Sequence, residues 1–309
     1  MRKVIPHIAA TLALALSSCT FTGVESTPKI TDKEVGNIVR VTPEEVKAQA
    51  VVDFNREPFE KWVAGKQFYV TDNNIRRIFS SSPMYSLDTL KLAHKTLTYM
   101  GYTTGGVLDN RALLNLRFSD GTHTYEYPTK KELEEISDNF EVPFLIDLDL
   151  VKMVKDRICG ETYYVRTASW IDASGNQIHG RKYVKVRIDA VMPGNNVYPI
   201  MLRFTDLEKE KYAFLWMTAG KTPIKNRSFD ALFSLTDIRA KYSHISDEVW
   251  ECIVDGRVKQ LMTKEECRLA WGTPKAMRSV PTYTGVREFW DYDNGRYLRF
   301  DDGLLEVIR

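Results

Sequence analysis

Hydrophobic and polar positions change their spacing several times along this chain, and the changes divide it into segments. Thr42-Pro43-Glu44-Glu45 is typical of a helix start. The threonine can cap the helix, proline fits its first position, and Glu45 can return a hydrogen bond to the cap. After Gly65 the apolar residues come in short aromatic and β-branched runs, which favour strands. We therefore expect a helix over residues 43–52, a further turn over 59–63, and strands from Lys66 onward.

The first β-rich segment contains three expected strands, over residues 66–70, 96–102 and 112–118. A capping box, Thr129–Glu132, predicts a short helix that extends to Ile136. A longer helix is expected over 150–158, ended by Gly160. Asp147 or Asp149 caps that helix; as an alternative, the two carboxylates form a pair on one side of an extended segment. We favour capping because both residues lie directly before the helix.

Two short motifs occur twice in the same order. Gly160-Glu-Thr-Tyr-Tyr-Val165 repeats the spacing of Gly65-Lys-Gln-Phe-Tyr-Val70, and Leu202-Arg-Phe-Thr-Asp206 repeats Leu116-Arg-Phe-Ser-Asp120. This order predicts a duplicated β module. Runs of short strands with Gly and Asn turns favour small antiparallel barrels, and SH3-like barrels are the specific expectation. In the second copy we expect strands over 163–171, 181–191, 197–204 and 212–218, with a turn at 172–175 that joins the first two.

The C-terminal segment combines helix and hairpin signals. After a possible short helix over 228–234, apolar residues at helical spacing predict a helix over 247–254. A capping box at Thr263 opens a second helix. Strands are expected over 288–292, 297–300 and 304–308, the first two joined through Asn294-Gly295, a strong hairpin signal. The predicted fold class is α+β and β-rich: two small antiparallel β modules with connecting helices, then two helices on one face of a small sheet.

The order of motifs in this last segment resembles the SmpA/OmlA family, which includes the small lipoprotein of the outer-membrane β-barrel assembly machinery. The resemblance covers residues 253–308, and Leu261 stands where the family usually has a glycine. It implies an envelope lipoprotein with a non-catalytic, partner-binding module. The residues that carry the pattern, all expected to be structural, are Gly256, Met262, Thr263, Glu266, Trp271, Gly272, Pro274, Trp290, Tyr292, Phe300 and Gly303.

The N-terminus has the marks of a secretory signal, namely Arg2 and Lys3, an apolar run over residues 8–16, and small residues. The run is shorter than the roughly 20 residues that a spanning helix needs. Leu16-Ser-Ser-Cys19 resembles the lipobox of bacterial lipoproteins, in which this cysteine carries the lipid and becomes the mature N-terminus. The alternative is an ordinary signal that contains a cysteine. Thr20 follows Cys19, and no acidic residue precedes Glu25, so the resemblance implies outer-membrane delivery, on its periplasmic or its outer side.

A chain of 309 residues is long enough for two or three domains of about 100–150 residues. Loss of the signal removes Arg2 and Lys3 and makes the basic and acidic residues equal in number. With no run of basic residues, nucleic-acid binding is not expected. The predicted division is signal peptide 1–18, tether 19–41, helix and first β module 42–138, helix and second β module 139–227, and C-terminal domain 228–309.

Three cysteines remain besides Cys19, which is an odd number for an oxidising compartment. Cys252 and Cys267 are the nearest pair in sequence and could form a disulfide. The alternative is that these two and Cys159 are buried free thiols, packed as small apolar groups. Neither reading provides a metal site.

Candidate chemistry is sparse. The histidines are scattered, and no nucleophile elbow, phosphate loop or dinucleotide fingerprint occurs. We therefore expect no catalytic residues, metal or cofactor. The predicted function is a lipid-anchored binding or scaffolding protein whose partners are the membrane, through its lipid, and other envelope proteins. The alternative is an envelope hydrolase or glycan-binding lipoprotein whose site forms only in the fold. A stacking platform for sugars would come from Tyr163, Tyr164, Trp170, Tyr183 and Trp216, although such residues usually pack in the core of a small barrel.

Overall fold

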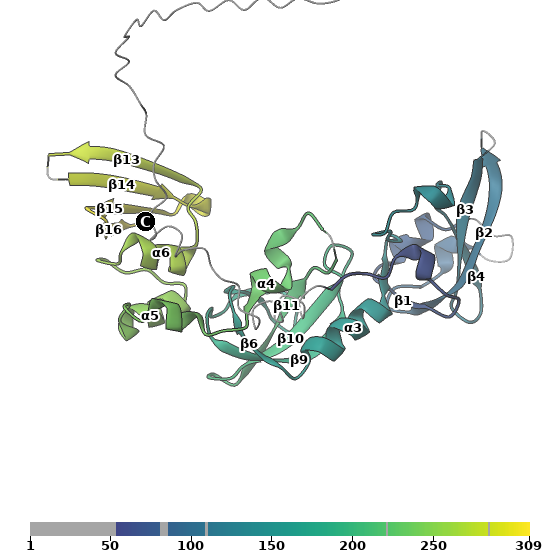
Figure 1. Ribbon diagram of the computed structural model, residues 1–309, viewed down its shortest axis with the longest axis horizontal. Coiled ribbons are helices and arrows are strands. Elements are labelled where there is room, and N and C mark those ends of the chain that lie inside the picture. The colour runs from purple at the N-terminus through teal and green to yellow at the C-terminus, as the bar shows by residue number, and fades with distance from the viewer. Residues whose placement is uncertain (1–53, 81–85, 109–110, 221, 284) are drawn as a thin grey trace, which may run out of the picture. The chain divides into compact units, whose positions relative to one another are not determined.

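The computed structural model describes residues 54–80, 86–108, 111–220, 222–283 and 285–309 (Figure 1). Over these residues the chain forms three antiparallel sheets and four α-helices, so the expected β-rich α+β class is confirmed. None of the helices in these ranges is long and apolar enough to cross a membrane. The predicted signal peptide, tether, lipid site Cys19 and helix over 43–52 lie outside the described residues.

The first sheet has the strand order β4-β3-β2-β1-β5. Its strands carry the expected runs, and an aromatic core of Phe68, Tyr99, Phe118 and Tyr125 fills one side. Short 3₁₀ turns, η1 (Phe59–Lys61), η2 (Asn73–Arg77) and η3 (Leu87–Thr89), lie between or before the strands. The strand bounds are β1 (Gln67–Val70), β2 (Thr96–Leu108), β3 (Arg111–Ser119), β4 (Thr124–Pro128) and β5 (Leu145–Asp147).

The two helices predicted next have opposite outcomes. Asp147 caps α3 (Leu148–Ile158) by accepting a hydrogen bond from the Asp149 amide at 2.9 Å, as expected. The helix predicted from Thr129 is wrong: only the 3₁₀ turn η4 (Leu133–Glu135) forms. The Thr129 hydroxyl donates instead to the Leu114 carbonyl of β3 at 2.9 Å. A tertiary hydrogen bond therefore replaces the local cap.

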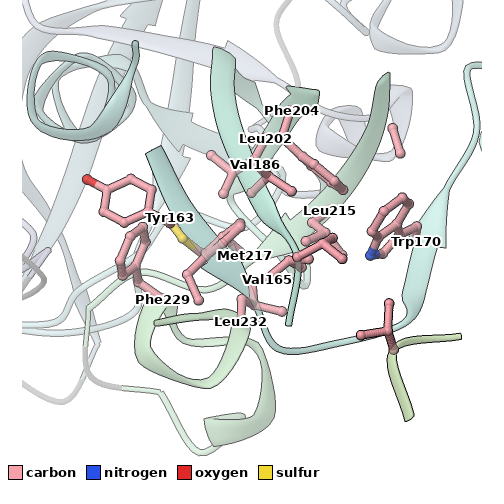
Figure 2. Packing of buried hydrophobic residues seen from close by; sticks show 14 of the residues in the cluster. Tyr163, Val165, Trp170, Val186, Leu202, Phe204, Leu215, Met217, Phe229 and Leu232 are labelled. Atoms are coloured by element: carbon pink, nitrogen blue, oxygen red, sulfur yellow. The ribbon is translucent and has the colours of Figure 1, made fainter. Parts of the chain in front are cut away.

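The second sheet has the order β12-β6-β9-β10-β11-β7-β8. Figure 2 shows its buried side chains, with Phe204 and Leu215 near Trp170. The strand expected over 163–171 is broken, because residues 162–165 pair with β9 and β12 whereas residues 169–171 pair with β11 and β8. The turn at 172–175 therefore joins β7 to β8 rather than to the strand near 185. The bounds are β6 (Thr162–Val165), β7 (Ser169–Ile171), β8 (Gln177–His179), β9 (Lys185–Pro193), β10 (Ile200–Asp206), β11 (Lys211–Met217), η5 (Lys225–Arg227), α4 (Phe229–Leu232), β12 (Phe233–Ser234) and η6 (Ile238–Tyr242).

The first two sheets share one pairing order. Strands β5-β1-β2-β3-β4 correspond to β12-β6-β9-β10-β11, with β7 and β8 added in the second sheet. The repeated motifs occupy equivalent places: Asp120 and Asp206 each accept from the amides two and three residues further on. The amides of Gly65 and Gly160 each donate at 2.8 Å to the strand paired with the one that follows. These correspondences support the duplication that the motifs predict.

The C-terminal segment contains α5 (Asp247–Val254) and α6 (Lys264–Trp271), then the sheet β13-β14-β15-β16. Ser246 and Thr263 cap the helices, and Thr263 and Glu266 form the expected reciprocal box. The predicted hairpin forms between β14 and β15, and its turn is a 3₁₀ turn, η7 (Asp293–Gly295). Strand β13 was not predicted, because its residues show no alternation and include Pro281. The bounds are β13 (Ala276–Thr282), β14 (Gly285–Asp291), β15 (Tyr297–Asp301) and β16 (Leu304–Ile308).

Leu261, the residue that departs from the family pattern, has a left-handed backbone with φ of 69°. Its amide donates to the Leu305 carbonyl at 2.8 Å, which holds the turn before α6 in this conformation. A side chain in the left-handed region costs about 1–2 kcal/mol, whereas glycine adopts it freely. The backbone at position 261 therefore favours the glycine that the family usually has there.

We expect Leu261→Gly to increase the free energy of unfolding by up to about 1 kcal/mol, since relief of the strain outweighs the greater freedom of the unfolded chain. Leu261 is 67% exposed, so little packing is lost. Urea denaturation followed by far-UV circular dichroism measures the change. Leu207→Gly, at an exposed leucine with ordinary φ, is the matched control and should destabilise. Equal destabilisation by both substitutions would contradict the strain.

Candidate binding sites

The motif residues of the C-terminal segment lie close together as packing and turn residues. Met262, Trp290 and Phe300 are buried, and the rings of Trp290 and Phe300 lie 4.6 Å apart. The Trp271 indole donates to the Gly256 carbonyl at 3.0 Å, and the Tyr292 hydroxyl donates to the Gly272 carbonyl at 3.2 Å. These polar groups are satisfied within the domain, so the motif builds the fold rather than a reactive centre.

The Cys252–Cys267 disulfide considered above is not formed: Cys159, Cys252 and Cys267 carry free thiols in this structure. Cys267 is a fully buried residue of α6, and burial raises the pKa of its thiol to about 12. A thiol with so high a pKa is protonated at neutral pH and inert as a nucleophile. Cys267 therefore acts as a small apolar core residue.

The five aromatic residues considered as a sugar platform do not assemble into one. Tyr163 packs edge-on against Phe229, and Trp170 packs edge-on against Phe204, both inside the core shown in Figure 2. Tyr183 instead stacks on Trp250 of α5. The rings of Tyr163, Trp170 and Tyr183 pack against other aromatic residues of the protein, so these five residues do not form a sugar-binding surface together.

Lys66 lies at the centre of a buried charge cluster. Its Nζ contacts carboxylate oxygens of Asp149 at 2.7 Å, Asp147 at 3.0 Å and Glu57 at 3.1 Å. Burial lowers the pKa of Lys66, but the hydrogen bonds that its ammonium donates to these carboxylates, together with the charge of Asp147, outweigh it and raise the pKa above the ordinary 10.5. Asp147 and Asp149 therefore do lie together, and they share a lysine rather than a substrate.

Lys182 is the second buried lysine, and its surroundings are different. Its Nζ donates to the Ala270 carbonyl at the end of α6, and the same ammonium lies 5.5 Å from the centre of the Tyr183 ring. No carboxylate lies within ion-pair distance of it among the described residues. Burial therefore lowers the pKa of Lys182 from 10.5 to about 8. At neutral pH a lysine with this pKa is still mostly protonated, so a buried positive charge lacks a counter-ion in the part of the chain that the structure describes.

A cavity of about 580 Å³ opens beside Lys182. Its basic residues are Arg166, His179, Lys182 and Arg296, and no aspartate or glutamate lines it. We call it the basic cavity. The Arg296 guanidinium lies 4.6 Å from the centre of the Trp271 ring, which also lines the cavity. Neutral polar groups complete it: Thr167, Ser169 and Gln177.

The segment that carries Lys182 is fixed firmly in place. The Lys182 amide donates to the Val254 carbonyl at 3.0 Å, and a His179 ring nitrogen lies 2.7 Å from the Asp255 carbonyl oxygen. Between them, Arg181 forms ion pairs with Asp206, Glu208, Glu251 and Asp255. The basic cavity is thus lined by a segment that the ends of α5 and α6 hold rigidly.

Sequence reasoning missed the basic cavity. The sequence does contain one indication of it. Every second residue from Lys182 to Ile188 is buried, and the other buried residues of this run are Val184, Val186 and Ile188. A lysine at a buried position of a strand pattern is rarely found without a counter-ion, so such a lysine indicates a binding site or an ion pair. Arg166 and Arg296 line the same cavity from distant parts of the sequence, and no local signal predicts this.

A second cavity, of about 410 Å³, is a weaker candidate for a ligand-binding site. It is lined largely by apolar and neutral residues, among them Leu145, Val197 and Pro199. Its charged residues are paired: Arg56 and Glu141 form an ion pair of 2.8 Å, and Asp147 pairs with Lys66 at 3.0 Å. The second cavity thus lacks the unbalanced charge of the basic cavity.

A further candidate surface is the β13–β14 hairpin, residues 276–291. Strand β13 is an edge strand of its sheet, and every residue but the last is exposed. Met277, Val280 and Val286 are 55%, 48% and 47% exposed, and the side chain of Tyr283 at the tip is fully exposed. Exposed apolar side chains on an edge strand and on its neighbour β14 mark a surface for contact with another chain.

No group of three or more potential metal ligands occurs among the described residues. Comparison of the chain with protein-family models, curated proteins and solved structures finds no match. The argument for function therefore depends on the sites themselves.

Proposed function

We propose that this protein is a lipid-anchored, non-catalytic component of the bacterial outer-membrane envelope that binds another envelope protein through the β13–β14 hairpin. The anchor rests on the lipobox-like sequence that ends at Cys19. The binding role rests on one observation, the exposed apolar side chains along the edge of β13. An extended segment of the partner would add to this edge as a further strand, because β13 has no neighbouring strand on its outer side among the described residues.

The finer fold assignments belong to the same proposal. An SmpA/OmlA-like C-terminal domain is supported by the motif residues, by the order of α5, α6, β14, β15 and β16, and by the left-handed backbone at Leu261. SH3-like character of the two β modules is supported by their shared strand order. The domain boundaries at residues 138 and 227 remain predictions.

We expect a photoreactive benzoylphenylalanine in place of Tyr283 to form one discrete heteromeric adduct in intact envelopes. The side chain projects fully from the hairpin tip and can reach a strand placed beside β13. The same substitution at Tyr212, an exposed tyrosine of β11, is the matched control and should form no such adduct. Adding Met277→Glu should abolish the adduct, because a carboxylate on the edge opposes apolar contact. Mass spectrometry of the adduct is the measurement.

The outcomes separate the two parts of the proposal. Cys19→Ala in the same experiment removes the lipid acceptor and should move the protein from the membrane to the soluble fraction, with loss of the adduct. Retention in the membrane would contradict the lipid anchor. Equal adducts from both tyrosine positions, or an adduct that contains only two copies of this chain, would contradict a hairpin that binds a different protein.

A further inference from the structure

The basic cavity is a binding site distinct from the hairpin, and its charge points to its ligand. Arg166, His179, Lys182 and Arg296 line it without an acidic side chain. Like charges gathered around one space repel each other unless an anion lies among them. We propose that the basic cavity binds a small organic anion, a phosphate monoester or a carboxylate of about the size of a sugar, with Lys182 as its buried counter-ion.

Comparison of the two buried lysines carries the argument. Lys66 and Lys182 are almost equally buried, at 5% and 9% exposure. Three carboxylates surround the Nζ of Lys66, whereas the Nζ of Lys182 donates to one carbonyl, that of Ala270. A buried ammonium is stable when it is paired and fully hydrogen-bonded. An oxyanion in the cavity would give Lys182 what the three carboxylates give Lys66.

The rest of the lining fits such a ligand. The carbonyl end of α6 carries partial negative charge, but Lys182 already binds its Ala270 oxygen and neutralises it. The Arg166 guanidinium is fixed by donation to the Asp230 carbonyl at 2.9 Å. The Trp271 ring and the neutral groups Ser169 and Gln177 offer stacking and hydrogen bonds to an uncharged part. A volume of about 580 Å³ lies within the usual range for small-molecule sites.

The test is isothermal titration calorimetry of the full-length chain in detergent at low salt. Glucose 1-phosphate and glucuronate are the anionic probes, and glucose is the neutral control of matched shape. We expect at least one anion to bind saturably and about tenfold or more tighter than glucose, because charge-assisted hydrogen bonds supply the difference. Lys182→Met should weaken that binding about tenfold or more. Lys185→Met, which removes the same charge from an exposed position of β9, should leave it unchanged within twofold.

Two outcomes would overturn the assignment: no saturable binding of either anion, or binding that Lys182→Met leaves intact. Lys182 also caps α6, so loss of the side chain could unfold the segment. Arg296→Gln then carries the test, because Arg296 is an exposed cavity residue that stacks on Trp271. It should weaken anion binding without lowering the melting temperature. A purely structural role for the basic residues would change melting and leave anion affinity untouched.

Discussion

Lys66→Met is expected to lower the free energy of unfolding by about 3–5 kcal/mol, the usual cost of removing one partner from a buried ion pair. The Lys66 ammonium lies 3.0 Å from Asp147 Oδ2, and both side chains are almost fully buried. Without the lysine, the Asp147 carboxylate remains in the interior with no counter-ion. The position of the Asp147 side chain also matters for the fold, because Asp147 caps α3 and is the last residue of β5. Urea denaturation followed by circular dichroism and by hydrogen exchange in residues 145–158 measures the loss.

A matched control separates burial from charge. Lys152 pairs with Asp156 at 2.8 Å on the exposed side of α3. Lys152→Met therefore also removes one lysine charge, but from an exposed ion pair. Exposed pairs contribute little, and no change beyond experimental error is expected. Asp147→Asn added to Lys66→Met should recover part of the lost stability, since the stranded charge is then gone. Equal effects of the Lys66 and Lys152 substitutions would contradict a buried cluster.

The pH dependence of this contribution follows from the pKa of Lys66. Because the folded-state pKa is raised above the ordinary 10.5, the folded protein holds the proton more tightly than the unfolded chain does. The Lys66 contribution is therefore complete at neutral pH and declines as the pH rises above 10.5 and through the folded-state pKa. Burial raises the pKa of Asp147 despite the nearby lysine, so the pair also loses its charge when acid protonates that carboxylate. The contribution of Lys182 to stability changes with pH in the opposite direction. Its pKa is lowered to about 8, so the ligand-free fold gains stability from this residue as the pH rises from 8 to 10.5.

Local signals in the sequence predicted those elements whose causes are local. The reciprocal hydrogen bonds of Thr263 and Glu266 involve residues three apart, and α6 begins where they predict. Asp147 likewise caps α3 through a neighbour two residues away. A cap satisfies backbone amides whatever the rest of the chain does, so such motifs are readable without a fold.

Elements with distant causes could not be read in this way. The box at Thr129 failed because its hydroxyl bonds to Leu114 on another strand. Strand β13 forms because residues 276–282 pair along their length with β14, although Pro281 and the lack of alternation argue against a strand. The basic cavity is the extreme case, since Arg166, Lys182 and Arg296 meet only after the sheet and both helices have formed.

Trp290→Ala is expected to destabilise the C-terminal segment by about 3–5 kcal/mol, the usual cost of truncating a fully buried aromatic residue. Trp290 has no exposed surface, its ring lies 4.6 Å from that of Phe300, and the Arg268 guanidinium lies 4.7 Å from its centre. These two contacts connect β14 to β15 and to α6. The loss should appear as faster hydrogen exchange in residues 285–309 and as a lower urea midpoint.

The Trp290 result also decides how the family-like motif is understood. Trp216 is a tryptophan on the half-exposed side of β11, and Trp216→Ala, as the matched control, should cost well under half as much because less of its surface is buried. A large effect at Trp290 alone means that the motif residues maintain the fold that presents the hairpin. If Trp290→Ala kept the stability of the C-terminal segment but lost the Tyr283 adduct, the motif would instead belong to the binding surface, and the structural interpretation of Met262, Trp271 and Phe300 would have to be abandoned with it.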